Sequence, residues 1–144
     1  MKRVSDILAS KGNEIWSVTP DTTVFDALQL MADKRIGAVL VIDKGQLVGL
    51  FSERDYARKI ILVGKSSKNT PVRDIMSSKL VCVQPDQWTG ECMGLMTEHR
   101  IRHLPVTTGE DLHGIITIGD VVKAIIAEKE EEIEHLQHYI TGSV

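Results

Sequence analysis

The chain alternates between short apolar runs and stretches in which apolar residues recur every three or four positions. The second spacing is typical of an amphipathic helix, and it occurs at Val24, Ala27/Leu28 and Met31, and again at Trp88, Cys92 and Leu95/Met96. The runs "AVLVI" and "LVGLF", and later "HLPV" and "LHGII", are joined by the turn-rich "DKGQ" and "TTGED", so each pair predicts two adjacent strands. With "WSV" or "LVCV" as a first strand, the predicted order is β-α-β-β-α, twice.

The two halves of the chain are copies of one unit. A shift of 65 positions aligns residues 18–61 with 83–126 without a gap, and a shift of 68 aligns residues 4–8 with 72–76. The extra residues fall in the polar "SKGNE" loop, where insertions are tolerated. A half of about 60 residues can hardly bury its apolar strands alone. We therefore expect an α/β (α+β) fold of two halves packed by pseudo-twofold symmetry.

This repeat sets the predicted boundaries. They are 1–63 for the first repeat, 64–70 for a polar linker, 71–127 for the second repeat, and 128–144 for a C-terminal helix extension and tail. Pro71 is expected at the N1 position of a helix.

Each half ends its second strand in a hydroxyl and, three residues later, an aspartate: "SERD" and "TIGD". Ser52 or Thr117 would cap a helix, with Asp55 or Asp120 as the acid of a capping box. The same arrangement also suits a ligand, because a helix N-terminus binds phosphate and a carboxylate one turn on can accept ribose hydroxyls. The glycine that precedes each phrase, at 49 or 114, would let another chain segment or the ligand come close.

These features resemble a tandem pair of CBS (cystathionine β-synthase) domains, also called a Bateman module. The resemblance rests on "VTPDTTVFDALQLM", "RIGAVLVID" and "LVGLFSERD", and on "VRDIM", "HRIRHLPV" and "LHGIITIGD" in the second copy. It implies a non-catalytic regulatory module that binds adenine nucleotides (AMP, ADP, ATP or NAD) in clefts between the repeats. S-adenosylmethionine is less expected, and no metal is required.

The resemblance also implies which residues line each cleft. The first-ranked cleft would use Thr22, Ala27, Ile36, Gly37, Arg102, His103, Thr117 and Asp120. The second would use Ala38, Ser52, Arg54, Asp55, Gln87 and Ile101. The cleft of Asp120 ranks first because the first repeat has Gly37-Ala38 where the second has the cationic Arg102-His103, and because Glu53 opposes a phosphate.

Ordinary structural roles also account for several of these residues. An exposed arginine and a capping histidine are common at the head of a strand, and Ile36 and Ile101 fit simple packing. Arg35 and Arg100 recur at a helix end, where cations interact well with the dipole, and helix capping is our preferred interpretation. The last two histidines, His135 and His138, fit a solvated helix face because no further ligand completes a metal site.

Composition argues against other classes of protein. A net charge of −3, a pI near 5.9 and few aromatic residues make nucleic acid an unlikely partner. The apolar runs are far shorter than the roughly 20 residues of a membrane span, and the N-terminus lacks the features of a signal peptide, so we expect a cytoplasmic protein. Cys82 and Cys92 fit no zinc spacing and are expected to be buried thiols.

The segment beyond Asp120 predicts one long helix. Its seam is spaced by four and three residues, as in a coiled coil with one polar break, at Val122, Ile126, Lys129, Ile133, Leu136 and Ile140. Pairing with the same helix of a second subunit and folding back onto its own body both remain open. A homodimer is expected from this seam and from the resemblance.

The leading hypothesis is an energy or metabolite sensor, read by its own oligomer or by an unidentified regulated enzyme or transporter. The alternative is a structural or interaction module with degenerate clefts, against which the presence of both Asp55 and Asp120 argues. Enzymatic activity is not expected, because the sequence has no catalytic triad order, metal-ligand set or glycine-rich phosphate loop.

Overall fold

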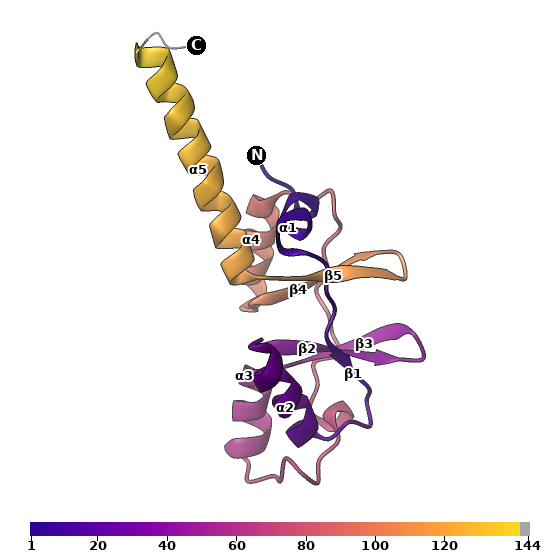
Figure 1. Cartoon of the computed structure of the whole chain (residues 1–144). Coiled ribbons are helices and arrows are strands. Elements are labelled where there is room, and N and C mark those ends of the chain that lie inside the picture. Colours follow the sequence, from indigo (N-terminus) through magenta and orange to yellow (C-terminus); the bar gives the residue numbers. More distant parts are fainter. Residues whose placement is uncertain (142–144) are drawn as a thin grey trace. The chain divides into compact units, whose positions relative to one another are not determined.

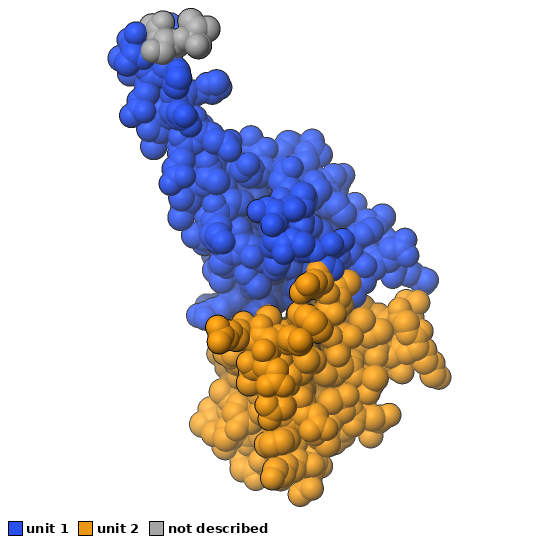
Figure 2. Space-filling view, viewed as in Figure 1, with its two compact units in different colours: residues 1–13, 81–144 blue, residues 14–80 orange. Residues whose placement is uncertain are grey.

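The computed structural model describes residues 1–141, which pack as two compact units (Figure 2). Unit 1 consists of Met1–Asn13 together with the chain from Val81 onward, and unit 2 consists of Glu14–Leu80. Both units mix helices with a small sheet, so the predicted fold class is confirmed (Figure 1).

Unit 2 contains the predicted β-α-β-β-α order. Its elements are β1 (Ser17–Val18), α2 (Val24–Lys34), β2 (Ala38–Asp43), β3 (Gln46–Ser52) and α3 (Glu53–Tyr56), followed by the π-helical turn η1 (Ala57–Ile61) and the 3-10 turn η2 (Val72–Asp74). The strand order is β1-β2-β3, with β1 parallel and β3 antiparallel to β2. The apolar side of α2 packs against this sheet, and the predicted Val24, Ala27 and Met31 are buried.

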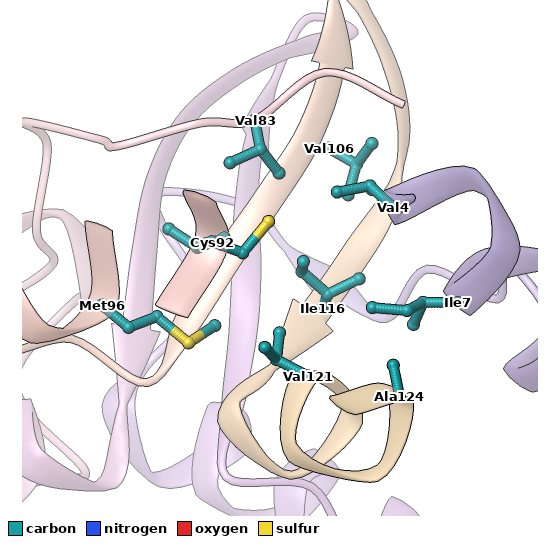
Figure 3. Close-up of a cluster of buried hydrophobic side chains, with 10 residues drawn as sticks. Val4, Ile7, Val83, Cys92, Met96, Val106, Ile116, Val121 and Ala124 are labelled. Atoms are coloured by element: carbon teal, nitrogen blue, oxygen red, sulfur yellow. The ribbon is translucent and has the colours of Figure 1, made fainter. Parts of the chain in front are cut away.

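Unit 1 repeats this arrangement with different details. It contains α1 (Val4–Lys11), α4 (Thr89–His99), β4 (His103–Thr108), β5 (Asp111–Thr117) and α5 (Ile118–Thr141). β4 and β5 pair antiparallel. The predicted strand "LVCV" forms only a single parallel bridge, between Val83 and Val106. The core of this unit gathers side chains from α1, α4, both strands and α5 (Figure 3).

The short segment at the start of each repeat packs in an unexpected place. Residues 4–8 align with 72–76 in the sequence, yet α1 belongs to the unit built from the second repeat, and η2 belongs to the unit built from the first. In unit 1, Leu8 lies so close to Gly114 that a Cβ on this glycine would be 3.1 Å from Leu8 Cδ2. In unit 2, Met76 approaches Gly49 in the same way. The close approach expected at these glycines is therefore made by chain segments.

Several local predictions can be compared directly with the structure. Arg35 and Arg100 end α2 and α4 in the left-handed conformation, with φ of 55° and 54°, which confirms that both lie at helix ends. Pro71 is not at N1: it precedes η2 with an extended ψ of 151°. Cys92 is buried as expected, but the prediction for Cys82 was wrong because its side chain is exposed.

The long C-terminal helix is confirmed. α5 runs over Ile118–Thr141, and its first turns lie on unit 1 through the buried Val121 and Ala124. Residues 129–141 are exposed, and α5 extends away from the rest of its unit (Figure 1). The last three residues of the predicted tail lie outside the described part of the chain.

Candidate functional site

Both repeated phrases form capping boxes. In unit 1 the Thr117 N–H donates to Asp120 Oδ2 at 2.9 Å, and the Asp120 N–H donates to Thr117 Oγ1 at 3.1 Å. In unit 2 the Ser52 N–H donates to Asp55 Oδ2 at 3.0 Å, and the Asp55 N–H donates to Ser52 Oγ at 3.3 Å. These bonds satisfy amide groups that a helix start otherwise leaves without acceptors. Capping is therefore one role of both aspartates.

The strands position these caps in the same way. Thr117 ends β5 opposite His103, the first residue of β4, and Ser52 ends β3 opposite Ala38, the first residue of β2. The first N–H of the helix donates to the carbonyl of the residue that precedes the opposite strand. The Ile118 N–H donates to the Arg102 carbonyl oxygen at 2.9 Å, and the Glu53 N–H donates to the Gly37 carbonyl oxygen at 3.1 Å. Four residues of the predicted first site, Arg102, His103, Thr117 and Asp120, therefore lie together in unit 1.

Only one oxygen of the Asp120 carboxylate accepts hydrogen bonds within residues 1–141. Its Oδ2 accepts from the Lys11 ammonium at 2.6 Å as well as from Thr117. No residue among 1–141 donates to its Oδ1, and the side chain is 19% exposed. The N–H of Gly119, between the two capped amides, also has no acceptor within this part of the chain. An acceptor and a donor therefore lie side by side at the start of α5.

The electrostatics of this site keep Asp120 ionised. Partial burial by itself would raise the pKa of the Asp120 carboxyl, but the hydrogen bonds from Lys11 and Thr117 and the positive charge of Lys11 outweigh burial and lower this pKa. Burial lowers the pKa of His103, and the neighbouring Lys11 and Arg102 lower it further, whereas Asp120 acts in the opposite direction. A histidine with a lowered pKa is predominantly neutral at pH 7. The fixed charges are therefore two cations and one carboxylate.

Asp55 is enclosed much more completely. Its Oδ2 accepts from the backbone and the hydroxyl of Ser52, and its Oδ1 lies 3.4 Å from Ser77 Oγ and 3.3 Å from Lys59 Nζ. The residue is 7% exposed. Both carboxylate oxygens are thus used inside unit 2, beside the exposed Glu53 and Arg54.

Lys11 is the site residue that the sequence analysis missed. It ends α1, and its ammonium also donates to the Ile115 carbonyl at 3.1 Å. A signal for it existed, because the shift that aligns residues 4–8 with 72–76 also aligns Lys11 with Lys79. What the sequence did not show was that α1 packs with the second repeat.

The other predicted site residues are divided between the two units. Thr22, Ala27, Ile36 and Gly37 belong to unit 2, where Ala27 is fully buried and Ile36 packs against the core. Gln87 and Ile101 belong to unit 1. The Gln87 amide bridges the Gln84 N–H and Glu91, and Ile101 packs against the core of unit 1.

Residues 1–141 contain neither a metal-binding cluster nor a membrane-spanning helix. No group of three or more His, Cys, Asp or Glu side chains in this range could hold a metal ion. None of the helices within it combines the length and the hydropathy needed to cross a bilayer.

The sequence profile of the CBS domain matches residues 4–62 and 72–127. The chain therefore belongs to the CBS domain family and carries a pair of these domains, which are generally regulatory modules. The mitochondrial CBS domain-containing protein CBSX3 of Arabidopsis thaliana is 43% identical over 149 residues, which cover 96% of this chain and 72% of the plant protein. A solved CBS-domain protein of Burkholderia ambifaria MC40-6 is 52% identical with a TM-score of 0.85, covering 88% of this chain and 95% of that one.

Two further solved structures share this fold. The CBS domain pair of protein MJ0100, in complex with 5′-methylthioadenosine and S-adenosyl-L-methionine, has a TM-score of 0.77 at 19% identity and covers 89% of this chain and 98% of that one. A hexameric CBS-CP12 protein from bloom-forming cyanobacteria has a TM-score of 0.79 at 26% identity, with 99% and 86% covered. Adenosine-type ligands and oligomers therefore both occur among proteins of this fold.

Proposed function

We propose that this chain is a regulatory module that binds an adenine nucleotide at the Thr117–Asp120 site. The observation that carries the proposal is the open side of the cap: neither Asp120 Oδ1 nor the Gly119 N–H has a partner within residues 1–141, and Lys11 and His103 lie close to Asp120. A ribose hydroxyl would donate to Asp120, and a phosphate would accept from Gly119 at the positive end of α5. AMP, ADP, ATP and NAD all carry both groups.

Regulation would follow from unequal binding to two conformations, because a ligand shifts an equilibrium only through its differential affinity for the two states. An enzyme or transporter, or another copy of the chain in an oligomer, would bind the ligand-stabilised conformation differently from the other one. The proposal includes no chemical step, and sustained turnover of a nucleotide by the purified protein would contradict it. The contribution of Thr22, Ala27, Ile36 and Gly37 to the base pocket stays a prediction from the family pattern.

The site of Asp55 ranks second in this proposal. A ribose hydroxyl at Asp55 would have to displace one of the present donors, because Ser77, Lys59 and the Ser52 cap already contact both carboxylate oxygens. The cost of leaving such donors without an acceptor is about 1–3 kcal/mol each. Ligand binding at Ser52, Arg54 and Asp55 would therefore be weaker than at Asp120.

Thermal unfolding with AMP, ADP, ATP, NAD and S-adenosylmethionine tests the proposal. At a hundredfold excess over Kd, a ligand of the folded state adds about 2.7 kcal/mol of stability. Asp120→Asn keeps an acceptor for the cap but removes the charge, and it should weaken binding about tenfold or more, since a hydrogen bond to a charged group is worth about 1.5–3 kcal/mol. Asp55→Asn is the matched control and should keep most of the shift, measured against its own ligand-free transition.

Two outcomes would contradict the assignment. If no ligand raised the unfolding temperature, the two phrases would be helix caps alone. If Asp55→Asn abolished the shift while Asp120→Asn kept it, the ranking of the two sites would be reversed.

The exposed seam of α5 favours a second role, association with another copy of the chain. The apolar residues of the predicted seam, Val122, Ile126, Ile133, Leu136 and Ile140, are 40–80% exposed. They lie on a different face of α5 from Val121 and Ala124, which pack into the core of unit 1. A seam spaced by four and three residues fits a partner helix with the same 3.5-residue period, which a second α5 provides. We propose a homodimer through this seam, and the hexameric relative supports association in general.

Sedimentation equilibrium tests this association. The double variant Ile133→Glu/Leu136→Glu should lower the molecular mass to that of the monomer, because each substitution places a charge in the seam. His138→Glu, on the opposite side of α5, should leave the mass unchanged. A wild-type protein that is monomeric at every concentration would rule out the dimer.

The cellular compartment stays a prediction. The sequence analysis favours the cytoplasm, whereas the name of the plant relative places that protein in mitochondria.

A further inference from the structure

Lys11 brings a second cation, besides Arg102, to the start of α5 from a distant part of the sequence. The eight-residue helix α1 ends at Lys11, where the chain turns through Gly12 at a φ of 86°. The Lys11 ammonium then lies 2.6 Å from Asp120 Oδ2 and 3.1 Å from the Ile115 carbonyl oxygen. Two acceptors fix its position, although the side chain remains 33% exposed.

This contact changes the charge that a ligand meets. An ionised Asp120 alone would attract a ribose hydroxyl but would repel a phosphate on the same ligand. Lys11 binds only Oδ2, so it cancels the charge of the carboxylate and leaves Oδ1 as an acceptor. Since Arg102 is a further cation and His103 is predominantly neutral, the balance of fixed charge at the site is positive.

We propose that Lys11 is a specificity-determining residue, which makes the Asp120 site select phosphate-bearing adenosine ligands over the uncharged nucleoside. The inference rests on the proposed function, because it names the ligand class of the same site. Lys11 contributes little to the binding of the nucleoside itself, which depends on Asp120 Oδ1. Its contribution appears when the ligand carries an anionic phosphate.

The equivalent lysine of the other repeat provides a matched control. Lys79 aligns with Lys11 in the sequence, but it is exposed and forms no ion pair among residues 1–141. In unit 2 the carboxylate of Asp55 is paired instead with Lys59, four residues along the same helical stretch. Substituting Lys79 therefore removes the same charge from the chain without touching either carboxylate.

Isothermal titration calorimetry with adenosine and AMP measures the selectivity. Wild type should bind AMP more tightly than adenosine. Lys11→Gln should weaken AMP binding about tenfold, equal to about 1.4 kcal/mol, and should change adenosine binding by less than about threefold, because removing a cation a few ångströms from a phosphate costs about 1–4 kcal/mol. Lys11→Arg should restore the preference, and Lys79→Gln should leave it intact. The AMP preference should also fall as salt is added.

The outcomes separate this inference from the proposed function. If Lys11→Gln weakened AMP and adenosine equally, Lys11 would only orient Asp120, and the selectivity proposal would be wrong while nucleotide binding stood. If Lys11→Gln changed neither ligand, the proposal would be wrong as well. If wild type bound neither ligand, the proposed function itself would fail and this inference with it. The unfolding transition of each variant, measured without ligand, shows that it is folded.

Discussion

The sites of Asp120 and Asp55 share one capping box and differ in what surrounds it. In unit 1 the cap is open on one side, since Asp120 uses a single oxygen and is held by a lysine from α1. In unit 2 both oxygens of Asp55 are used by Ser52, Ser77 and Lys59, and the residue is buried. The same capping motif, a hydroxyl residue followed three positions later by aspartate, thus forms a candidate ligand site in unit 1 and a buried structural contact in unit 2.

The difference arises from the segment that packs beside each cap. Ile115 and Leu50 are equivalent in the repeat, and the carbonyl of each faces this segment. In unit 2 the chain is extended after the short turn η2, and Ser77 exchanges two backbone hydrogen bonds with Leu50, each of 2.9 Å. In unit 1 the helix α1 continues for eight residues, and the Ile115 carbonyl accepts from Lys11 instead.

The length of the loop after α1 allows this helix to be longer than the turn η2. The first repeat has extra residues in "SKGNE", so the helix α1 continues to Lys11 and the chain still reaches β1. In the second repeat the shorter connection leaves only a three-residue turn, Val72–Asp74. The insertion thus accompanies a change of donor: a lysine side chain donates to the carbonyl of Ile115, and a backbone amide donates to that of Leu50.

The largest expected difference is in the stability cost of removing each aspartate. Asp55→Ala leaves the Ser52 N–H, Ser77 and Lys59 without their acceptor in a buried place, and should lower the free energy of unfolding by about 2–4 kcal/mol. Asp120→Ala should cost about 1 kcal/mol, the usual value for a cap near the surface. Urea denaturation of both variants measures the difference. Equal losses would show that the burial of Asp55 does not distinguish the two caps.

Much of this comparison could be predicted from the sequence. The repeat, the order of elements and both caps follow from hydrophobic spacing and from the position of Ser52 and Thr117 after an apolar strand. These are local features, set by residues a few positions apart. The higher rank of Asp120 also came from the sequence, through Arg102 and His103, and remains a proposal.

The features that were missed depend on contacts between distant residues. Nothing near Lys11 in the sequence indicates that it meets Asp120, because the pairing requires α1 to pack with the second repeat. The exposure of Cys82 has a similar origin: the predicted strand around it pairs only at Val83, and Cys82 lies outside the core. Hydrophobic spacing predicts that a segment packs but does not say which partner it packs against.

A smaller difference is expected at the two glycines. A Cβ at Gly49 would lie 2.5 Å from Met76 Sδ and 3.1 Å from the Ser77 carbonyl oxygen, whereas at Gly114 the nearest atom is Leu8 Cδ2 at 3.1 Å. Gly49→Ala should cost about 1–3 kcal/mol through overpacking, since a backbone atom cannot give way easily. Gly114→Ala should cost less, because the end of the Leu8 side chain can shift. Thermal unfolding compares the two, and a larger loss for Gly114→Ala would contradict the close packing of Met76 and Ser77 on Gly49.

The smallest expected difference concerns pH. Unit 1 has His103 where unit 2 has Ala38, and burial lowers the pKa of His103, with Lys11 and Arg102 acting in the same direction. The unfolded chain then binds a proton at about pH 6.5 that the folded chain takes up only at lower pH, so the stability contributed by neutral His103 is present above about pH 6.5 and is lost as the pH falls below it. The carboxyl of Asp120, whose pKa is lowered, titrates at more acidic pH.

Urea denaturation between about pH 5 and about pH 7 measures this contribution. His103→Gln should flatten the rise in stability over that interval relative to wild type. Lys11→Gln should flatten it in part, because it removes one of the cations that lower the pKa of His103. A wild-type slope in His103→Gln would mean that His103 is not the group that titrates. A wild-type slope in Lys11→Gln alone would mean that burial, and not the neighbouring lysine, sets the pKa of this histidine.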